Sequence, residues 1–430
     1  MRVLVLGSGA KDHAIAWWFS KSSYISALFV APGNISTQDF AKNLPDVNPA
    51  NPHAVYSACI ENAIDFVFIG TEAPLFTGVV EYISSKGITV FGAPSKSIKL
   101  EGDRAFSRSF TQRHNIPVPK NSLFVDIQGL EKYLNEHEGE QFIIKSNSVA
   151  PSRVMLNSAD TKALLDYAKL LFTKGPVLLE ECVHGIPATC TLLVDNHGYL
   201  MLPITSDYTS VSKTNTTPTG GMGAICPVPL VDEVKEKIIA KIVEPTLYGM
   251  KVEQLAYKGV LTLSLILKDG VEPVLVDYHI RFNDPATQAM VPIIKTDIIE
   301  ILDAMTRNEV SSIKLEMSDD CTVAVVLASP GYPLKPIMDI KIEGISNTFL
   351  MNLEDKPFVF CGAIDLNKDG IPVTTGGRNL TIVGVGKNIE EANKKAYTLI
   401  QNKRFVDLWY REDIGNSFFK NSSNIKDGIF

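Results

Sequence analysis

The sequence predicts a multidomain protein that combines α/β and α+β architecture. Three observations support this fold class. The 430 residues exceed what one hydrophobic core usually supports. The first hundred residues alternate short β-rich runs with helical segments, which is typical of a doubly wound parallel sheet. Further along the chain, several strand-like runs surround one helical segment, as expected for a smaller α+β unit.

The N-terminal part is expected to hold parallel strands that alternate with helices. The strands are predicted at residues 3–6, 27–30, 66–69 and 88–91, and the helices at residues 11–20 and 76–84. Each strand ends in a turn rich in Gly or Pro. Ligands bind at the carboxyl ends of the strands in such sheets, so these turns are candidate binding elements.

The middle of the chain is predicted to contain the smaller unit. Residues 101–118 resemble a helix and its exit, and strands at 142–145, 154–156, 177–179 and 191–194 surround a helix at 161–172. The Thr/Ser-rich run 205–219 has no usable periodicity, which indicates a functional loop or lid. Strands follow near 259–267 and 273–281, and a closing subdomain has strands near 322–327 and 380–385 and a helix at 389–401.

Composition narrows the class of protein. Hydrophobic residues make up 45%, charged residues 21%, and the net charge is −7, which offers no basic field for nucleic acid. The six cysteines lack any C-x-x-C spacing, which favours free thiols in a reducing compartment. The first residues do not form a signal peptide, and no run of about 18 apolar residues occurs. We therefore expect a cytoplasmic protein with neither a nucleic-acid nor a membrane partner.

The most informative stretch is a polar pattern within an apolar strand. Asp277, His279 and Arg281 stand two residues apart, and a turn with Asn283 and Asp284 follows. Because side chains alternate across a β-strand, the three polar residues should line one face. The residues expected to pack on the other face are Val276, Tyr278 and Ile280. The pattern predicts the wall of a polar site, and an amphipathic edge strand is the competing interpretation.

The turn at residues 7–9 stands between a strand and a helix. A dinucleotide fingerprint would need a third glycine where Asp12 stands, and an acid there would repel a pyrophosphate. A single phosphate or phosphosugar at the helix start suits the backbone amides, with Lys11 and His13 nearby. A purely structural turn is the alternative.

Two further strand ends point to a nucleotide. Lys145 ends one apolar strand, where a lysine often only extends its stem along a buried run. Glu180 and Glu181 end another strand, from which a linker could offer backbone groups to a base. A cleft between the two units would then be the nucleotide site.

The order of motifs resembles the phosphoribosylamine–glycine ligase family of ATP-grasp enzymes over essentially the whole chain. Residues 7–17 resemble G-N-G-G-R-E-H-A-x-A-W, residues 70–75 resemble G-P-E-A-P-L, residues 100–106 resemble L-E-G-S-K-A-F, and residues 281–288 resemble R-F-G-D-P-E-T-Q. The stretches A-P-G-N at 31–34, H-N-I-P at 114–117 and T-G-G-M-G-A at 219–224 match outright. G-Y-P at 331–333, T-G-G-R at 375–378 and D-I-G at 413–415 agree too.

This resemblance implies an ATP-grasp fold with a pre-ATP-grasp domain at 1–100, a linker and lid at 101–190, a central catalytic domain at 191–320 and a C-terminal closing domain at 321–430. It implies ATP-driven condensation of 5-phosphoribosylamine with glycine, through glycyl phosphate, in purine biosynthesis. The products would be glycinamide ribonucleotide, ADP and phosphate. The partners would be these small molecules, and a monomer or homodimer is expected.

The resemblance also implies roles for particular residues. Those expected to bind ATP are Arg104, Lys145, Arg153, Glu180, Glu181 and Val183. Those expected to bind the other substrates are Gly9, Lys11, His13, Asn34, Glu72, Gly220, Gly221 and Arg378. Arg281 would face the developing acyl phosphate, and Asp284 would help to position the substrates. Asp277 and His279 would hold Mg²⁺ or Mn²⁺.

The departures from the family pattern concentrate in the nucleotide half. Residues 145–155 replace K-A-D-G-L-A-A-G-K-G-V, so three glycines become Ser148, Ser152 and Val154, and the loop cannot approach a triphosphate as closely. Pro187 stands where the family has the glutamate that holds the ribose of ATP, and residues 207–210 replace a basic stretch.

The metal ligands of the family, Glu and Asn, become Asp277 and His279, and imidazole suits manganese better than magnesium. Two alternatives to the ligase follow from these departures. One is a relative with a degraded ATP site that binds a phosphosugar or nucleotide-like ligand, and the other is a ligase with an altered substrate.

Overall fold

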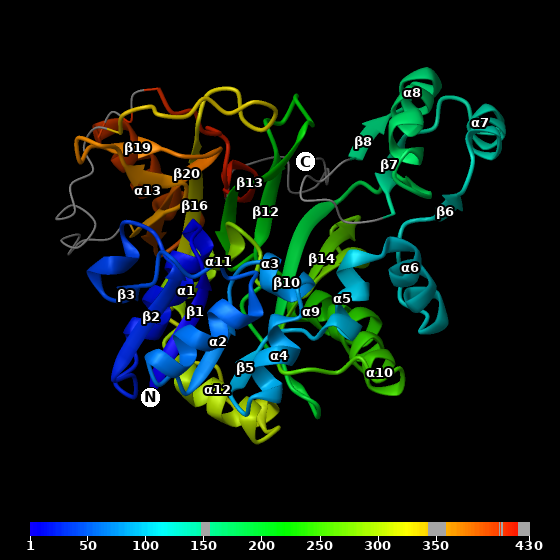
Figure 1. Cartoon of the computed structure of the whole chain (residues 1–430). Helices are drawn as coiled ribbons and strands as arrows, with labels where there is room; N and C mark the ends of the chain where they lie inside the picture. The colour runs from blue at the N-terminus through cyan, green and yellow to red at the C-terminus, as the bar shows by residue number, and fades with distance from the viewer. Residues whose placement is uncertain (148–154, 343–357, 404, 406, 420–430) are drawn as a thin grey trace.

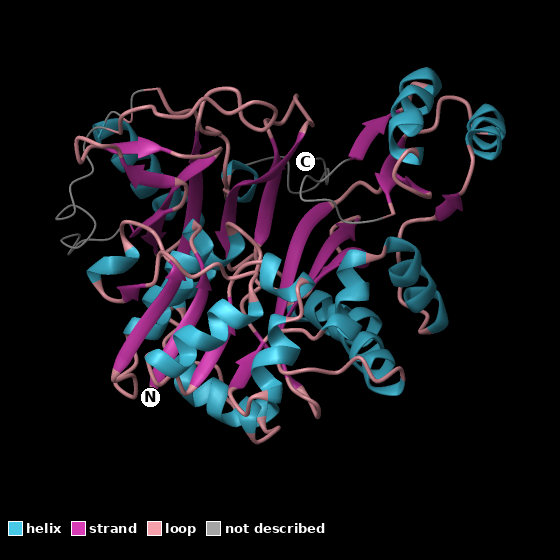
Figure 2. Cartoon of the chain, viewed as in Figure 1, coloured by secondary structure: helices cyan, strands magenta, loops and turns pink. Residues whose placement is uncertain are grey.

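The computed structural model describes residues 1–147, 155–342, 358–403, 405 and 407–419. Within these residues the chain forms four sheets of four or five strands and a two-stranded sheet. Figure 2 shows helices against the sheets of the main body, and a smaller unit that projects from it. The predicted ATP-binding Arg153 lies outside the described residues, as do Ser148, Ser152 and Val154.

The N-terminal domain is the predicted parallel sheet. Its strands pair in the order β3-β2-β1-β4-β5, all parallel. The strands are β1 (Arg2–Gly7), β2 (Ala27–Pro32), β3 (Lys42–Asn43), β4 (Phe66–Ile69) and β5 (Thr89–Phe91), and the helices are α1 (Ala10–Ser20), α2 (Pro52–Glu61), α3 (Ala73–Phe76) and α4 (Val79–Ser85). The single helix predicted at 76–84 is two helices, because Gly78 between them has a φ of 75°.

The projecting unit, which we call the lid, is the antiparallel sheet β6-β9-β7-β8 with two helices on it (Figure 1). Its elements are β6 (Asn121–Phe124), α7 (Ile127–Glu136), β7 (Phe142–Ser146), β8 (Met155–Ser158), α8 (Thr161–Phe172) and β9 (Val177–Glu181), and α5 (Ser95–Gly102) and α6 (Arg104–Arg113) precede it. Leu130, Phe142 and Leu164 belong to a core that the lid has for itself. The prediction that residues 191–194 belong to this unit was wrong, because they pair with other strands.

Those residues lie in β10, within the central antiparallel sheet β11-β10-β14-β15. Its strands are β10 (Ile186–Val194), β11 (Tyr199–Met201), β14 (Gly259–Lys268) and β15 (Glu272–His279), and α9 (Asp232–Ile238), a π-helix (Ile239–Val243) and α10 (Glu244–Val252) precede β14. In the sequence, residues 191–194 look like a separate short strand. In the structure they are the end of the nine-residue strand β10, which pairs along its whole length with β14.

The remaining sheet has the order β12-β13-β16-β20-β17. Its strands are β12 (Ser206–Ser210), β13 (Pro218–Cys226), β16 (Cys321–Ala328), β17 (Phe358–Cys361) and β20 (Arg378–Gly386), accompanied by α11 (Ala286–Met290), α12 (Ile298–Thr306), α13 (Ile389–Lys403) and the small sheet of β18 (Ile364–Leu366) and β19 (Pro372–Thr374). Short 3₁₀ helices occupy Thr37–Asp39, Val291–Ile293, Val310–Ser312 and Asn416–Phe418. The run at 205–219, predicted as a loop, is largely the hairpin of β12 and β13, whose polar residues pair without hydrophobic alternation.

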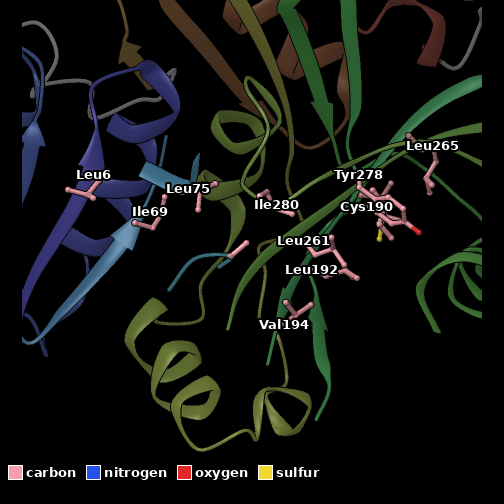
Figure 3. Packing of buried hydrophobic residues seen from close by; sticks show 14 of the residues in the cluster. Leu6, Ile69, Leu75, Cys190, Leu192, Val194, Leu261, Leu265, Tyr278 and Ile280 are labelled. Carbon is pink, nitrogen blue, oxygen red and sulfur yellow. The ribbon is translucent and has the colours of Figure 1, made fainter. Parts of the chain in front are cut away.

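One core joins the N-terminal domain to the central sheet. Figure 3 shows Leu6 and Ile69 of the parallel sheet in the same cluster as Leu192 and Leu261 of the central sheet. This packing brings the carboxyl ends of the parallel strands toward the end of β15. Among the helices that the structure describes, none is long and apolar enough to cross a membrane.

Candidate functional site

A cavity of 1840 Å³ opens where the N-terminal turns, the end of β15, β13, β20 and the lid come together. Eleven of the residues predicted as site residues line it: Gly9, Lys11, Asn34, Glu72, Arg104, Gly220, Asp277, His279, Arg281, Asp284 and Arg378. They come from segments far apart in the sequence, so the fold assembles them.

The wall formed by β15 alternates in part as predicted. Tyr278 and Ile280 are each 1% exposed and lie in the core, as Figure 3 shows, but Tyr278 also borders the cavity that Asp277 and His279 line. Val276, predicted to join the core, is only half-buried, because the register with β14 shifts between Ser264 and Leu265. This irregularity turns the Val276 carbonyl toward Arg108, whose guanidinium donates to it.

Arg281 lies just beyond β15, between two carboxylates. Its NH2 atom is 2.7 Å from Oε1 of Glu72 and 3.4 Å from Oε1 of Glu101. Nearby, NH1 of Arg378 lies 3.1 Å from Oδ1 of Asp284 and donates to the Gly220 carbonyl at 2.7 Å. The N-terminal, central and C-terminal parts of the chain therefore meet here through ion pairs.

Several polar atoms around the cavity lack partners. Among the described residues, buried side-chain atoms without a hydrogen-bond partner include Oδ1 of Asp12, Nε of Arg104, Nε of Arg281 and Oδ1 of Asn283, and all four residues line the cavity. Buried polar groups are normally paired, so unpaired ones need an explanation such as a bound ligand or water. Their concentration here indicates a wall built for polar ligands.

Two predicted ATP-binding residues on the lid, Lys145 and Glu180, form a buried ion pair instead of lining the cavity. Nζ of Lys145 is 2.7 Å from Oε2 of Glu180 and 3.4 Å from Oδ2 of Asp277. Arg108 pairs with the other oxygen of Glu180 at 2.5 Å. Lys145 and Glu180 are each 1% exposed, and neither lines the cavity.

Asp277 is the member of this network that reaches the cavity. Burial opposes its ionisation, but the positive charges of Lys145, Arg104 and Arg108 outweigh burial and hold the pKa of Asp277 well below its usual range. The carboxylate is therefore charged at neutral pH and is balanced by cations of the chain itself.

Four other predicted residues do not line the cavity, namely Glu181, Val183, Gly221 and His13. Glu181 points toward Lys120, with 3.8 Å between Oε2 and Nζ, and Val183 lies in the segment after β9. Gly221 has a φ of 109° and lies against the Asp284 carbonyl, where a Cβ would come within 2.4 Å. It shapes the turn at Asp284 rather than the cavity surface.

His13, predicted to bind substrate, is a packing residue instead. It is 5% exposed, and its Nδ1 accepts a hydrogen bond from the Cys361 amide at 3.0 Å. Its ring packs against Phe40 and Phe360, with centroids 5.6 and 5.5 Å away. Burial lowers the pKa of His13 to about 3, so the ring is neutral and joins α1 to β17.

Asp12, which was not predicted as a site residue, occupies the helix start. Its Oδ2 accepts hydrogen bonds from the amides of Ser8 and Gly9 at 3.0 and 2.9 Å. These are two of the amides predicted to hold a phosphate, so that part of the prediction was wrong. An acid at the third helical position is the signal for such a cap. Burial raises the pKa of Asp12 to about 6.

The donor set suits a divalent cation only in part. Asp277 offers carboxylate oxygen, its side chain is 26% exposed, and Mg²⁺ is often held by one or two carboxylates together with substrate phosphates. Both ring nitrogens of His279 are engaged, Nδ1 with Glu101 and Nε2 with Ser264, each at 3.1 Å. No group of three or more potential metal ligands occurs within the described part of the chain.

The lid sheet, the central antiparallel sheet and the polar cavity between them define an ATP-grasp protein. A solved structure of the biotin carboxylase domain of the Hydrogenobacter thermophilus 2-oxoglutarate carboxylase, a complex with MgADP, covers the whole of this chain with a TM-score of 0.71 and 15% identity. At that identity the likeness concerns the fold alone.

The chain belongs to the phosphoribosylglycinamide synthetase family. Models of its N domain, ATP-grasp (A) domain and C domain match residues 1–101, 102–287 and 322–417. A phosphoribosylamine–glycine ligase from Caldanaerobacter subterraneus is 32% identical over 428 residues, which cover 97% of this chain and 100% of that protein. The trifunctional purine biosynthetic protein adenosine-3 of Gallus gallus is 32% identical over 96% of this chain and 42% of its own length. The solved phosphoribosylamine–glycine ligase of Thermotoga maritima has a TM-score of 0.79 and 27% identity, over 96% of this chain and 100% of that one.

Proposed function

We propose that the chain catalyses the ATP-driven condensation of 5-phosphoribosylamine with glycine, giving glycinamide ribonucleotide, ADP and phosphate. The observation that carries this proposal is the cavity at which all three family domains meet, with Arg281, Glu72, Asp284 and Arg378 paired across it. An amine, an amino acid and a phosphate donor carry both signs of charge, and this wall offers both.

The reaction needs two bonds to form in turn. The glycine carboxylate attacks the terminal phosphoryl group of ATP, which releases ADP and gives glycyl phosphate. The amine nitrogen then attacks the acyl carbon, phosphate leaves, and the nitrogen loses a proton. In such chemistry positioning and charge neutralisation do most of the work.

Four of the charged residues that line the cavity act on the amine and the amino acid in this proposal. The guanidinium of Arg281 neutralises the carboxylate and then the acyl phosphate. Glu72 and Asp284 attract the amino groups, while Lys11, which is 5% exposed and lines the cavity, faces the phosphate of the phosphosugar. Gly9, Asn34 and Gly220 shape the cavity surface, because their own polar groups are engaged within the chain.

ATP would lie between the lid and the central sheet. Arg104 lines the cavity, as Asp277 does, and is more exposed than Lys145. A divalent cation at Asp277, Mg²⁺ or Mn²⁺, would neutralise phosphate charge when bound. Glu181 and Val183, near the end of β9, would border the base.

A second candidate is a binding protein that retains the phosphosugar pocket without ATP chemistry. The observation that favours it is the buried pairing of Lys145 with Glu180 and Asp277, which already neutralises the charge of the lysine. The two candidates differ in the fate of ATP and share the N-terminal pocket.

The deciding experiment measures ADP release from ATP with both co-substrates, with each omitted in turn, and in Mg²⁺ and Mn²⁺ separately. If the chain is the ligase, ADP release should require glycine and should rise further with phosphoribosylamine. If neither metal supports glycine-dependent ADP release, the ligase proposal fails and the binding protein is favoured.

A further inference from the structure

Glu101 was not predicted as a site residue, yet its carboxylate contacts several residues around the cavity wall. It lies in the last turn of α5 and is 8% exposed. Its Oε2 accepts a hydrogen bond from the Ile280 amide at 3.0 Å. Its Oε1 lies 3.1 Å from Nδ1 of His279 and 3.4 Å from NH2 of Arg281. One carboxylate thus contacts three consecutive residues at the end of β15.

The charges of this cluster indicate a firmly held carboxylate. The Ile280 amide and the Arg281 guanidinium can only donate hydrogen bonds, so the Glu101 carboxylate accepts from both. Nδ1 of His279 faces the same accepting oxygen, which assigns the ring proton to Nδ1. The other nitrogen, Nε2, meets the Ser264 hydroxyl at 3.1 Å. The imidazole is therefore held at both ends.

The two carboxylates beside Arg281 differ in their surroundings. The Glu72 side chain is 48% exposed and belongs to the N-terminal domain, whereas the Glu101 side chain is 6% exposed and is fixed to β15. Apart from these, the guanidinium donates from NH1 to the Phe282 carbonyl at 3.2 Å. Without the charge of Glu101, the strongest attraction on Arg281 comes from the exposed Glu72.

We propose that Glu101 is a positioning residue, which holds the Arg281 guanidinium and the His279 ring in the orientation that the reaction needs. This inference rests on the proposed function for its kinetic consequence. Its structural part, the contact between Glu101 and His279, stands apart from any activity. Glu101 acts through its neighbours and has no assigned contact with substrate.

The chain supplies a matched control elsewhere. Glu253 also accepts from one arginine and one histidine, with 2.8 Å to NH2 of Arg113 and 2.8 Å to Nε2 of His114. Neither Glu253 nor its two partners line the cavity. Glu101→Gln and Glu253→Gln therefore make the same chemical change in the same kind of cluster, and only the first lies at the site.

The kinetic test varies glycine and ATP separately in the ADP-release assay. Losing a charged hydrogen bond that orients the site corresponds to about a ten- to hundredfold effect. We expect Glu101→Gln to lower kcat/KM for glycine by that factor while KM for ATP changes less than about threefold. Glu253→Gln should leave both constants within about twofold. Because both changes act through one guanidinium, Glu101→Gln should add little to the loss caused by Arg281→Lys.

A second measurement does not depend on turnover. In protein labelled with ¹⁵N-histidine, the Nδ1 proton of His279 should give a downfield resonance, assigned by its loss in His279→Asn. Glu101→Gln should shift or abolish this resonance, and Glu253→Gln should retain it. An unchanged resonance in Glu101→Gln, or equal kinetic losses in the two glutamine variants, overturns the proposal. A wild-type protein without glycine-dependent ADP release would instead defeat the proposed function, and the resonance would still decide whether Glu101 holds His279.

Discussion

The charged residues on the two sides of the cavity differ in whether they line the open space or are buried beside it. On the amino-acid side, Arg281, Glu72 and Asp284 line the open space, and unpaired polar atoms lie beside them. On the nucleotide side, Lys145 and Glu180 are each 1% exposed and pair with each other. Both sets form ion pairs, but the first lines the open space, whereas the second is enclosed within the protein.

This difference follows the departures in the sequence. Of the three stretches that match the family outright, those at residues 31–34 and 219–224 contribute to the open side, and the one at 114–117 does not. The stretch that lost its glycines, residues 145–155, begins at Lys145. The half proposed to bind the nucleotide therefore combines a stretch that has lost three glycines with a lysine that Glu180 already neutralises, and we expect ATP binding to be the step most sensitive to these changes.

The largest expected effect is the loss of stability when the buried ion pairs of Glu180 are removed. Glu180→Ala would leave Lys145 and Arg108 buried without their shared carboxylate, and breaking such a pair costs about 3–5 kcal/mol. The neighbouring change Glu181→Ala removes only a contact to a lysine that is 90% exposed, worth about 0–1 kcal/mol. Denaturant unfolding of both variants measures the difference. Similar losses in the two variants would show that the closed network contributes no more than a surface pair.

A smaller effect is expected on the pH dependence of the free energy of unfolding, through His13, which joins α1 to β17. The pKa of His13 is lowered from 6.5 to about 3 by burial, so the unfolded chain takes up a proton that the folded chain refuses. Stability from His13 is thus complete above pH 6.5 and is lost as the pH falls toward 3. Between pH 7 and 5 this loss is about 2 kcal/mol.

His13→Asn keeps an acceptor for the Cys361 amide and cannot titrate in this range. Its unfolding free energy should therefore change less between pH 7 and 5 than that of the wild type, by about the same 2 kcal/mol. Parallel pH profiles for the two proteins would mean that His13 is not held neutral.

The smallest expected effect compares one lysine from each side. Lys11 lines the cavity, whereas Lys145 does not. Lys11→Ala should weaken the binding of ribose 5-phosphate about tenfold, or roughly 1.4 kcal/mol, and Lys145→Met should leave it unchanged. Calorimetric titration of both variants against the wild type measures this. Equal weakening by the two changes would place the phosphosugar elsewhere.

Much of the fold and part of the site could be predicted from the sequence. Alternation of polar and apolar residues identified the strand with Asp277, and helical periodicity identified the helix at 161–172, because both patterns are local. The pairing of residues 186–194 with β14 could not be predicted, since the partners are more than 60 residues away. The hairpin of β12 and β13 could not be predicted either, because its paired residues are 8 to 19 positions apart and its polar sequence has no period.

The site shows the same division. Residue types and motif order brought Arg281, Asp284 and Arg378 into consideration, and the structure places all three on one cavity. Their roles in catalysis stay predictions. Sequence could not show that Lys145 is enclosed by Glu180, that His13 faces Phe40 and Phe360, or that Glu101 reaches His279, because each contact forms only when distant segments pack together.

Direct detection of the product tests the central claim most plainly. The protein would be incubated with ATP, a divalent cation, freshly formed phosphoribosylamine and ¹⁵N-glycine, and the mixture analysed by mass spectrometry. The account predicts glycinamide ribonucleotide that carries the label, one ADP for each product molecule, and at least a tenfold lower yield with Arg281→Ala. Consumption of ATP without labelled product, or no reaction in either Mg²⁺ or Mn²⁺, would contradict it.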